Sequence, residues 1–337
     1  VAPAAVECEG LIHAYDTKPV LNGVTFQVAK GSVYGFIGPN GAGKTTTLRI
    51  LATLLEPTGG TARIAGHDVT SHPELVRRVL GYMPDTPGTY ERVGVGEYLD
   101  FFASAHGMHG AARRAAVERA IELTEIGPLR PSQVTSLSKG QRQRLLLART
   151  LLHDPEVLLL DEPASDLDPR ARIELRTLLA KLGRMGKTIL LSSHILTELA
   201  ELCDAIGVLE GGRIVVSGPI DEVEALAANL VRGAHAGRRV RITVIERGDD
   251  AAAVLQASPL VRAVVAIPAE RPGFRTFEVA HDGDERVVAE LVSLLAREQI
   301  AVCAVEPERA DLERIFMDVT ARSQAPRAAT PEPGVAR

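Results

Sequence analysis

A short run near the start of the chain has the residue types and spacing of a phosphate-binding loop. It reads Gly38-Pro39-Asn40-Gly41-Ala42-Gly43-Lys44-Thr45 and fits the pattern GxxxxGK[ST] in full. Glycines let successive backbone N–H groups face one anion, and a helix beginning at Lys44 adds its positive end. We expect Lys44 to reach the β- and γ-phosphates of a nucleoside triphosphate and the Thr45 hydroxyl to bind Mg²⁺.

The flanking residues give this run the context that a phosphate loop needs. Ser32–Ile37 is an apolar, strand-like run, and Thr46–Leu55 has the apolar spacing of a helix. A bare match to the pattern also occurs in glycine-rich turns, but a strand before it and a helix after it favour the phosphate loop. Thr46 is assigned to the same nucleotide site.

Two adjacent carboxylates follow a second buried strand. Val157–Leu160 is wholly apolar and ends at Asp161-Glu162, and α/β sheets bind ligands at the carboxyl ends of such strands. Asp161 is expected to bind Mg²⁺, and Glu162 to accept a proton from the attacking water or to orient it. Two acids could merely cap the strand, but the phosphate loop favours the catalytic interpretation.

The bulk composition excludes several classes of protein. The 337 residues suggest two domains, and the net charge of -5 argues against a dedicated nucleic-acid binder. Three widely spaced cysteines predict neither disulfides nor a zinc site. No uncharged run approaches the ~18 residues that a membrane helix needs, so a membrane function would require another chain.

Strands alternate with helices over the first two thirds of the chain, which predicts an α/β sheet. Val6–Val28 contains β-like runs broken by Asp16, Lys18 and Asn22-Gly23. Further predicted elements are a strand pair near Gly60–Ala65, a mostly helical stretch over Tyr90–Leu152, a helix over Arg170–Leu182, a strand over Lys187–Ser192, a helix over Ile195–Leu202, and a hairpin formed by Ile206–Leu209 and Arg213–Val216.

A second domain is predicted after the loop Asn229–Arg239. The β-α-β-β-α-β order indicates a small ferredoxin-like α+β fold. Its predicted elements are Val240–Ile245, Ala251–Gln256, Val261–Ile267, Phe274–Val279, Glu285–Arg297 and Ile300–Val305, with Leu312–Val319 following. The expected domains are therefore residues 1–228, with a helical subdomain at about 86–155, and 238–321, followed by a disordered Pro- and Ala-rich tail, 322–337.

Further motifs resemble those of ABC-type ATPases. Ser136–Arg144 is similar to that family's LSGGQ signature, and Leu159–Pro169 to its Walker B segment and D-loop. Ser192-Ser193-His194 resembles its switch histidine. The resemblance covers Val6–Leu226, and its motif order implies a P-loop NTPase core of the ABC type.

The resemblance assigns roles to individual positions. Tyr15 matches the aromatic residue that stacks on adenine, although an ordinary strand aromatic is the competing interpretation. Ser138, Gly140 and Gln141 would contact the γ-phosphate of a nucleotide bound by the opposite subunit. Asp168 would contact the second subunit across the dimer interface, and His194 would contact the γ-phosphate.

Two positions depart from the family's pattern. Asp85 stands where the family usually has Gln, and an ionised Asp can only accept hydrogen bonds. Asp85 is assigned to the catalytic set by its position and to the metal site through water, but it cannot orient water as an amide would. Lys139 replaces the first of the two signature glycines. The remaining histidines, including His67, His106, His109 and His153, have no ligand spacing and are expected on the surface.

The resemblance also implies a function. Glu97–Ala103 and Leu312–Phe316 are similar to the ATPase subunits of bacterial exporters for drugs, lipids or polysaccharides. Such subunits bind ATP and Mg²⁺, form an ATP-sandwich dimer with a second copy, and pair with an integral membrane permease at the cytoplasmic face of the membrane. Two alternatives remain: a soluble ABC-type ATPase acting on ribosomes or DNA, and a regulatory module that barely hydrolyses ATP.

Lys44→Ala should lower nucleotide affinity, because it removes the positive charge expected on the β- and γ-phosphates. Equilibrium binding of ATP measures this directly. Unchanged affinity would contradict the assignment of Lys44.

Overall fold

The computed structural model describes residues 3–86, 88, 92–194, 199, 201–223, 238–267, 273–282 and 285–307. The chain divides into two units, Val1–Val223 and Glu224–Arg337. Most of the predicted helix Ile195–Leu202 lies outside the described residues, as do nearly all of the predicted loop Asn229–Arg239, the predicted helix Leu312–Val319 and the tail 322–337.

A six-stranded sheet forms the centre of the first unit, in the order β10-β9-β3-β8-β7-β6. Its strands are β3 (Val33–Ile37), β6 (Leu80–Met83), β7 (Val157–Leu160), β8 (Thr188–Ser193), β9 (Ala205–Glu210) and β10 (Arg213–Pro219). All neighbours are parallel except β9 and β10. Every residue of β3, β7 and β8 is buried, which explains the wholly apolar sequence of β7 and the apolar centre of β8.

A four-stranded antiparallel sheet has the order β2-β1-β4-β5. It contains β1 (Ala4–Tyr15), β2 (Lys18–Ala29), β4 (Gly59–Ile64) and β5 (His67–Asp68). Lys18 and Asn22-Gly23 do not interrupt β2, so the predicted breaks there were wrong. The register passes from Leu11 opposite Val24 to Ile12 opposite Asn22, and Gly23, with φ 93°, is the extra residue of a β-bulge.

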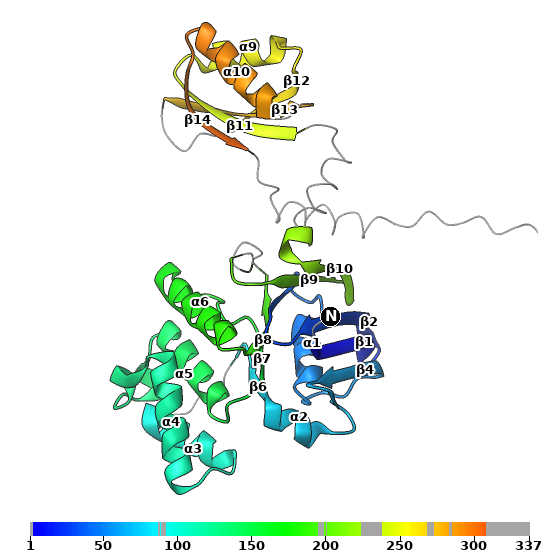
Figure 1. The fold of residues 1–337 in the computed structure, drawn as a ribbon, viewed down its shortest axis with the longest axis vertical. Coiled ribbons are helices and arrows are strands. Elements are labelled where there is room, and N and C mark those ends of the chain that lie inside the picture. Colours follow the sequence, from blue (N-terminus) through cyan, green and yellow to red (C-terminus); the bar gives the residue numbers. More distant parts are fainter. Residues whose placement is uncertain are drawn as a thin grey trace, which may run out of the picture. The chain divides into compact units, whose positions relative to one another are not determined.

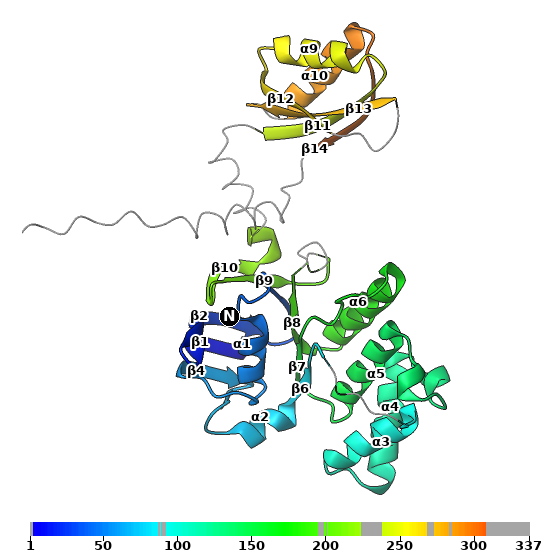
Figure 2. The same ribbon diagram turned by 180° about the vertical axis from the view of Figure 1, so that it is seen from behind.

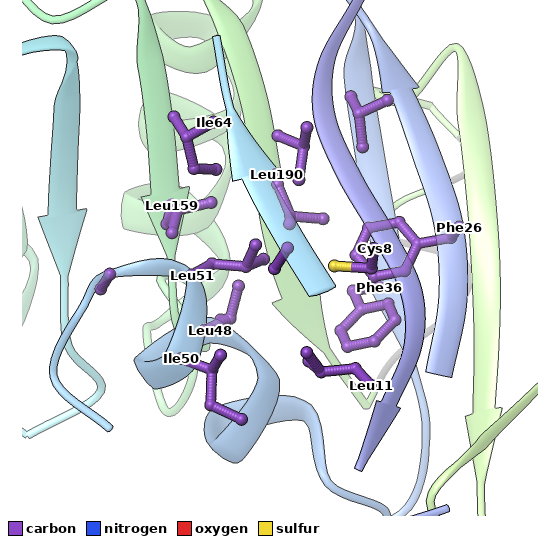
Figure 3. Packing of buried hydrophobic residues seen from close by; sticks show 14 of the residues in the cluster. Cys8, Leu11, Phe26, Phe36, Leu48, Ile50, Leu51, Ile64, Leu159 and Leu190 are labelled. Atoms are coloured by element: carbon purple, nitrogen blue, oxygen red, sulfur yellow. The ribbon is translucent and has the colours of Figure 1, made fainter. Parts of the chain in front are cut away.

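Helix α1 (Lys44–Leu51) packs against both sheets (Figures 1 and 3). In Figure 3 its Leu48 and Leu51 face Leu159 and Leu190 of the central sheet. The helix ends before the predicted Leu55, because Thr53 adopts φ 60°, a left-handed conformation that cannot continue it. The core thus fixes the helix that starts at the glycine loop.

Helices lie on the opposite side of the central sheet (Figures 1 and 2). They are α3 (Val95–Ala105), α4 (Gly110–Thr124), α5 (Lys139–Leu151) and α6 (Pro169–Arg184), while α2 (Pro73–Val79) precedes β6. Helix α5 contacts β6, and α3 and α4 pack on α5. Helices α3, α4 and α5 share a buried cluster that includes Leu99, Ile121 and Leu145. The predicted helical stretch after Met83 is therefore confirmed.

The second unit has the predicted ferredoxin-like topology. Its elements are β11 (Arg238–Ile245), α9 (Gly248–Ala257), β12 (Val261–Ile267), β13 (Phe274–His281), α10 (Glu285–Arg297) and β14 (Ala301–Pro307). The antiparallel sheet has the order β12-β13-β11-β14, and its core includes Ile242, Phe277 and Leu291. Within the described residues, no helix combines the length and apolarity required to cross a membrane.

Candidate active site

The strand register brings the predicted site residues to one edge of the central sheet. Ile37 at the end of β3 pairs with Ser193 of β8, and Leu160 at the end of β7 pairs with Leu191. Because these strands are parallel, the residues after them, the glycine loop, His194 and Asp161-Glu162, emerge at the same edge.

The glycine loop is packed too tightly for side chains at two positions. A Cβ on Gly38 would collide with the backbone oxygen of Leu209. Gly43 has φ 110°, and a Cβ there would lie 2.5 Å from Cδ2 of Leu21. Both positions therefore require glycine, and the loop between them is fixed against β2 and β9.

Lys44 extends back across the loop. Its side chain is 6% exposed, and Nζ donates a hydrogen bond of 2.6 Å to the Gly38 carbonyl. Nζ also lies 3.2 Å from Oε1 of Glu162, whose side chain is 14% exposed. One buried cation thus reaches both the glycine loop and the second of the two carboxylates.

Ser192 of β8 joins the two adjacent acidic residues. Its hydroxyl donates to Oδ1 of Asp161 at 2.7 Å and accepts from the backbone N–H of Glu162 at 2.9 Å. Burial raises the pKa of the Asp161 carboxyl, hydrogen bonding to Ser192 and Thr45 lowers it, and the charges of Asp85 and Glu162 raise it further. Burial is the largest of these effects.

Asp161 and Thr45 fit a divalent cation. Asp161 is 1% exposed, and its buried Oδ2 has no hydrogen-bond partner among the described residues. An unpaired buried carboxylate oxygen is costly, and a cation such as Mg²⁺, which prefers oxygen ligands, would compensate it. Asp85 is exposed, but its negative charge also acts on Asp161.

Glu162 is held in an unusual conformation between two cationic or polar partners. Its φ of 46° lies in the left-handed region that non-glycine residues rarely adopt. Oε2 lies 2.9 Å from Nδ1 of His194, while Oε1 faces Lys44. Since a carboxylate oxygen only accepts, Nδ1 carries the proton of this bond, and the other ring nitrogen, Nε2, is left for another partner.

The remaining predicted site residues form a second cluster at the starts of α5 and α6. Ser138 caps α5: its hydroxyl accepts from the Gln141 N–H, and the Gln141 side chain accepts from the Ser138 N–H. Asp168 caps α6 through the N–H of Ala171 at 3.0 Å. A Cβ on Gly140 would lie 2.8 Å from the Ala171 Cβ, so the two helix starts are in close contact.

The two clusters remain separate within this chain. Among the described residues, no hydrogen bond or ion pair joins Ser138, Gly140, Gln141 or Asp168 to the glycine loop. Tyr15 lies at the end of β1 with its side chain 42% exposed. The predicted residues thus form three groups. The first is the glycine loop with the two carboxylates and the histidine, the second is the pair of helix starts, and the third is the exposed ring of Tyr15.

Several structural partners of the site were missed in the sequence. Ser192 was noted only as part of a motif, and its two hydrogen bonds depend on the pairing of β7 with β8. Lys139 forms an ion pair of 2.7 Å with Asp166 in the D-loop. Asn22 binds the β9–β10 turn, whose Gly212 N–H donates to Ala42 of the glycine loop. None of these pairings has a local sequence signal.

The prediction of surface histidines was wrong for His13 and His281, which are buried, and for His153. Its ring is partly buried and stacks on His106 with centroids 4.1 Å apart, and Nε2 contacts the Leu80 carbonyl at 2.8 Å. Burial lowers the pKa of His153, and burial lowers that of His106 to about 4. Among the described residues, no cluster of potential metal-binding side chains includes them.

Comparisons with known proteins identify the class that this fold and site define. Residues 21–165 match the family model described as ABC transporter. The daunorubicin/doxorubicin resistance ATP-binding protein DrrA of Streptomyces peucetius is 33% identical over 320 residues, covering 94% of this chain and 92% of that protein. The Nod factor export ATP-binding protein I of Paraburkholderia xenovorans is 39% identical over 219 residues, 64% of this chain and 71% of that protein.

A solved structure described as an ATP binding subunit of an ABC transporter is also similar, with a TM-score of 0.60 and 32% identity. The match covers 66% of this chain and 93% of that one. The chain belongs to the family of ABC transporter ATP-binding subunits, and it is an ATP-hydrolysing enzyme. The resemblance found in the sequence is thereby confirmed.

Ser192→Ala should shift the acid limb of the pH–rate profile of ATP hydrolysis to higher pH. Removing the hydroxyl removes a bond that lowers the pKa of Asp161, so protonation would abolish metal binding at a higher pH. The lost hydrogen bond favoured the ionised carboxylate, so the pKa of Asp161 rises further above its usual range. The pH dependence of the hydrolysis rate at saturating ATP measures it.

Thr124→Val is the matched control, because it removes another fully buried hydroxyl, one that bonds to Ala120 within α4. Its acid limb should coincide with that of the unmodified protein. An unmoved limb in Ser192→Ala would show that Asp161 does not govern the acid side of the profile.

Proposed function

We propose that this chain energises export of a small amphiphilic, lipid-like or saccharide molecule through a separate integral membrane permease, to which it binds at the cytoplasmic face of the membrane. The main support is the similarity to a drug-resistance ATP-binding protein over 94% of the chain, which extends well beyond the first unit. A second relative is named for Nod factor export.

In the proposed nucleotide site, the glycine loop, residues 38–45, binds the phosphates through its backbone N–H groups and the start of α1. The buried ammonium of Lys44 neutralises the terminal phosphates. Thr45 and Asp161 would hold Mg²⁺, with Asp85 contributing through water, and the ion would supply charge neutralisation on the phosphate oxygens. Tyr15 stacks on the adenine ring through its exposed face.

Glu162 acts on the attacking water in this proposal. Its Oε1 is oriented by Lys44 and its Oε2 by His194, so the carboxylate is held in one direction. It accepts the water proton or aligns the water for in-line attack. His194, fixed through Nδ1, presents Nε2 to the γ-phosphate.

The second cluster acts on a nucleotide bound by another copy of the chain. Two helix starts lie together at Ser138–Gly140 and Asp168–Ala171, and helix N-termini favour anions. As the resemblance to the ABC-type signature implies, the phosphate they serve belongs to the second copy. Two chains thus form two composite sites, and ATP binding favours the closed dimer.

A groove of about 220 Å³ is a candidate contact for the permease. Its lining includes Asp85, Lys139, Arg142 and Gln143, so it connects the position that departs from the family with the signature helix α5. A permease loop bound there would act on both the metal site and the paired helix start. This is the reason to place the membrane partner beside Asp85.

Glu162→Gln should retain ATP binding while lowering hydrolysis by ~10²–10⁴-fold, the usual contribution of a general base. Closed dimers should accumulate with ATP, because their opening depends on hydrolysis. Turnover assays and light scattering after size exclusion measure the two effects. The control Glu156→Gln neutralises a half-exposed carboxylate at the other end of the same strand and should change neither. Unchanged turnover in Glu162→Gln would remove Glu162 from this role.

Membranes containing the permease that pairs with this chain should stimulate its ATPase activity, and the permease should copurify with it. The physical reason is that a transport partner changes the population of the closed dimer. Stimulation by ribosomes or DNA, with none by membranes, would instead support the alternative soluble role. Hydrolysis at background level under every condition would support a regulatory module.

A further inference from the structure

His13 is buried without polar compensation. Its side chain lies in β1 and is 6% exposed, and neither ring nitrogen has a hydrogen-bond partner among the described residues. Buried polar groups are normally hydrogen-bonded, because leaving them unpaired costs free energy. Among the described residues, the ring of His13 therefore interacts with its surroundings through packing and not through a hydrogen bond.

The ring of His13 is in contact with the ring of Tyr15. Their centroids are 4.8 Å apart and their planes are inclined by 81°, which is an edge-to-face arrangement. Residues two apart in a strand share one face, so the two rings lie next to each other along β1. This pairing is favourable beyond the burial of its surface.

His13 also lies between Tyr15 and the phosphate loop. It pairs in register with Leu21 of β2, and directly opposite side chains in a sheet are in contact. Leu21 is fully buried and packs closely against Gly43, the residue that precedes α1. A continuous line of packing therefore runs from the glycine loop through Leu21 and His13 to Tyr15.

Tyr15 needs such support. It is the last residue of β1, and the chain turns at Asp16, which has φ 53°. Its side chain is 42% exposed, so much of its surface makes no contact with this unit. An unsupported ring at the end of a hairpin loses rotational freedom when it stacks on a base, and this loss weakens binding.

We infer that His13 is a positioning residue for the adenine ring of ATP: its contact with Tyr15 orients the tyrosine ring for stacking. The inference rests on the role proposed for Tyr15. His13 acts on the base end of the nucleotide and not on the phosphates. It should therefore alter affinity for ATP without altering affinity for a triphosphate that lacks the base.

The test measures equilibrium binding of Mg²⁺-ATP and of Mg²⁺-tripolyphosphate to the full chain. His13→Leu fills the buried space but lacks a ring, and His13→Phe retains a ring. We expect His13→Leu to weaken ATP binding about three- to tenfold, which is the change in affinity that the interaction free energy of one aromatic pair corresponds to. Tripolyphosphate binding should stay within twofold, and His13→Phe should restore ATP affinity. KM for ATP should rise in His13→Leu with kcat unchanged.

His153→Ala is the control, because it removes another partly buried imidazole that is in ring contact, outside the nucleotide site. It should leave both affinities unchanged. Thermal unfolding of each variant checks that the first unit is folded. Where His13→Leu is unfolded, His13→Gln takes its place with the same expectation.

Two results would overturn the inference. One is equal weakening of ATP and tripolyphosphate, which would mean that His13 supports the glycine loop through Leu21. The other is unchanged ATP affinity in His13→Leu while Tyr15→Ala weakens ATP binding selectively. Unchanged ATP affinity in Tyr15→Ala would instead remove the proposed role of Tyr15, and the inference with it.

Discussion

The parallel register of β3, β8 and β7 is the constraint on which the active site depends. Ile37 pairs with Ser193, and Leu160 pairs with Leu191, so three strands end side by side. Each strand is buried along its whole length, and charged side chains can therefore occur only beyond the strand ends. The 3.2 Å contact between Lys44 and Glu162 follows from this arrangement, although 118 positions separate the two residues in the chain numbering.

Burial then gives these charges their strength. Lys44, Asp161 and Glu162 have little contact with solvent, and interactions between charges are stronger where water is excluded. The same burial raises the pKa of Asp161, and the hydrogen bonds of Ser192 and the nearby Lys44 charge offset part of the cost of ionised carboxylates. The site is a buried set of charges and donors that phosphates and a divalent cation would complete.

Local sequence patterns predicted those parts of the fold and site that depend on neighbours in the chain. The apolar run Val157–Leu160 and the glycine pattern before Lys44 needed only adjacent residues to be recognised. The bulge at Gly23 was missed, because a turn-forming Asn-Gly pair also occurs inside a strand when the extra residue is left unpaired opposite the partner strand. The early end of α1 was also missed, because the apolar spacing of the sequence continues past Leu51.

The sequence alone determined which chemical groups are present: a phosphate loop, two adjacent carboxylates after a buried strand, and a helix start with the ABC-type signature. Tertiary structure decided which groups meet. It joined Ser192 to both acidic residues, Lys139 to Asp166, and His13 to Leu21 across the hairpin. Such contacts depend on strand register and helix packing between distant segments, and no pattern within a single segment specifies them.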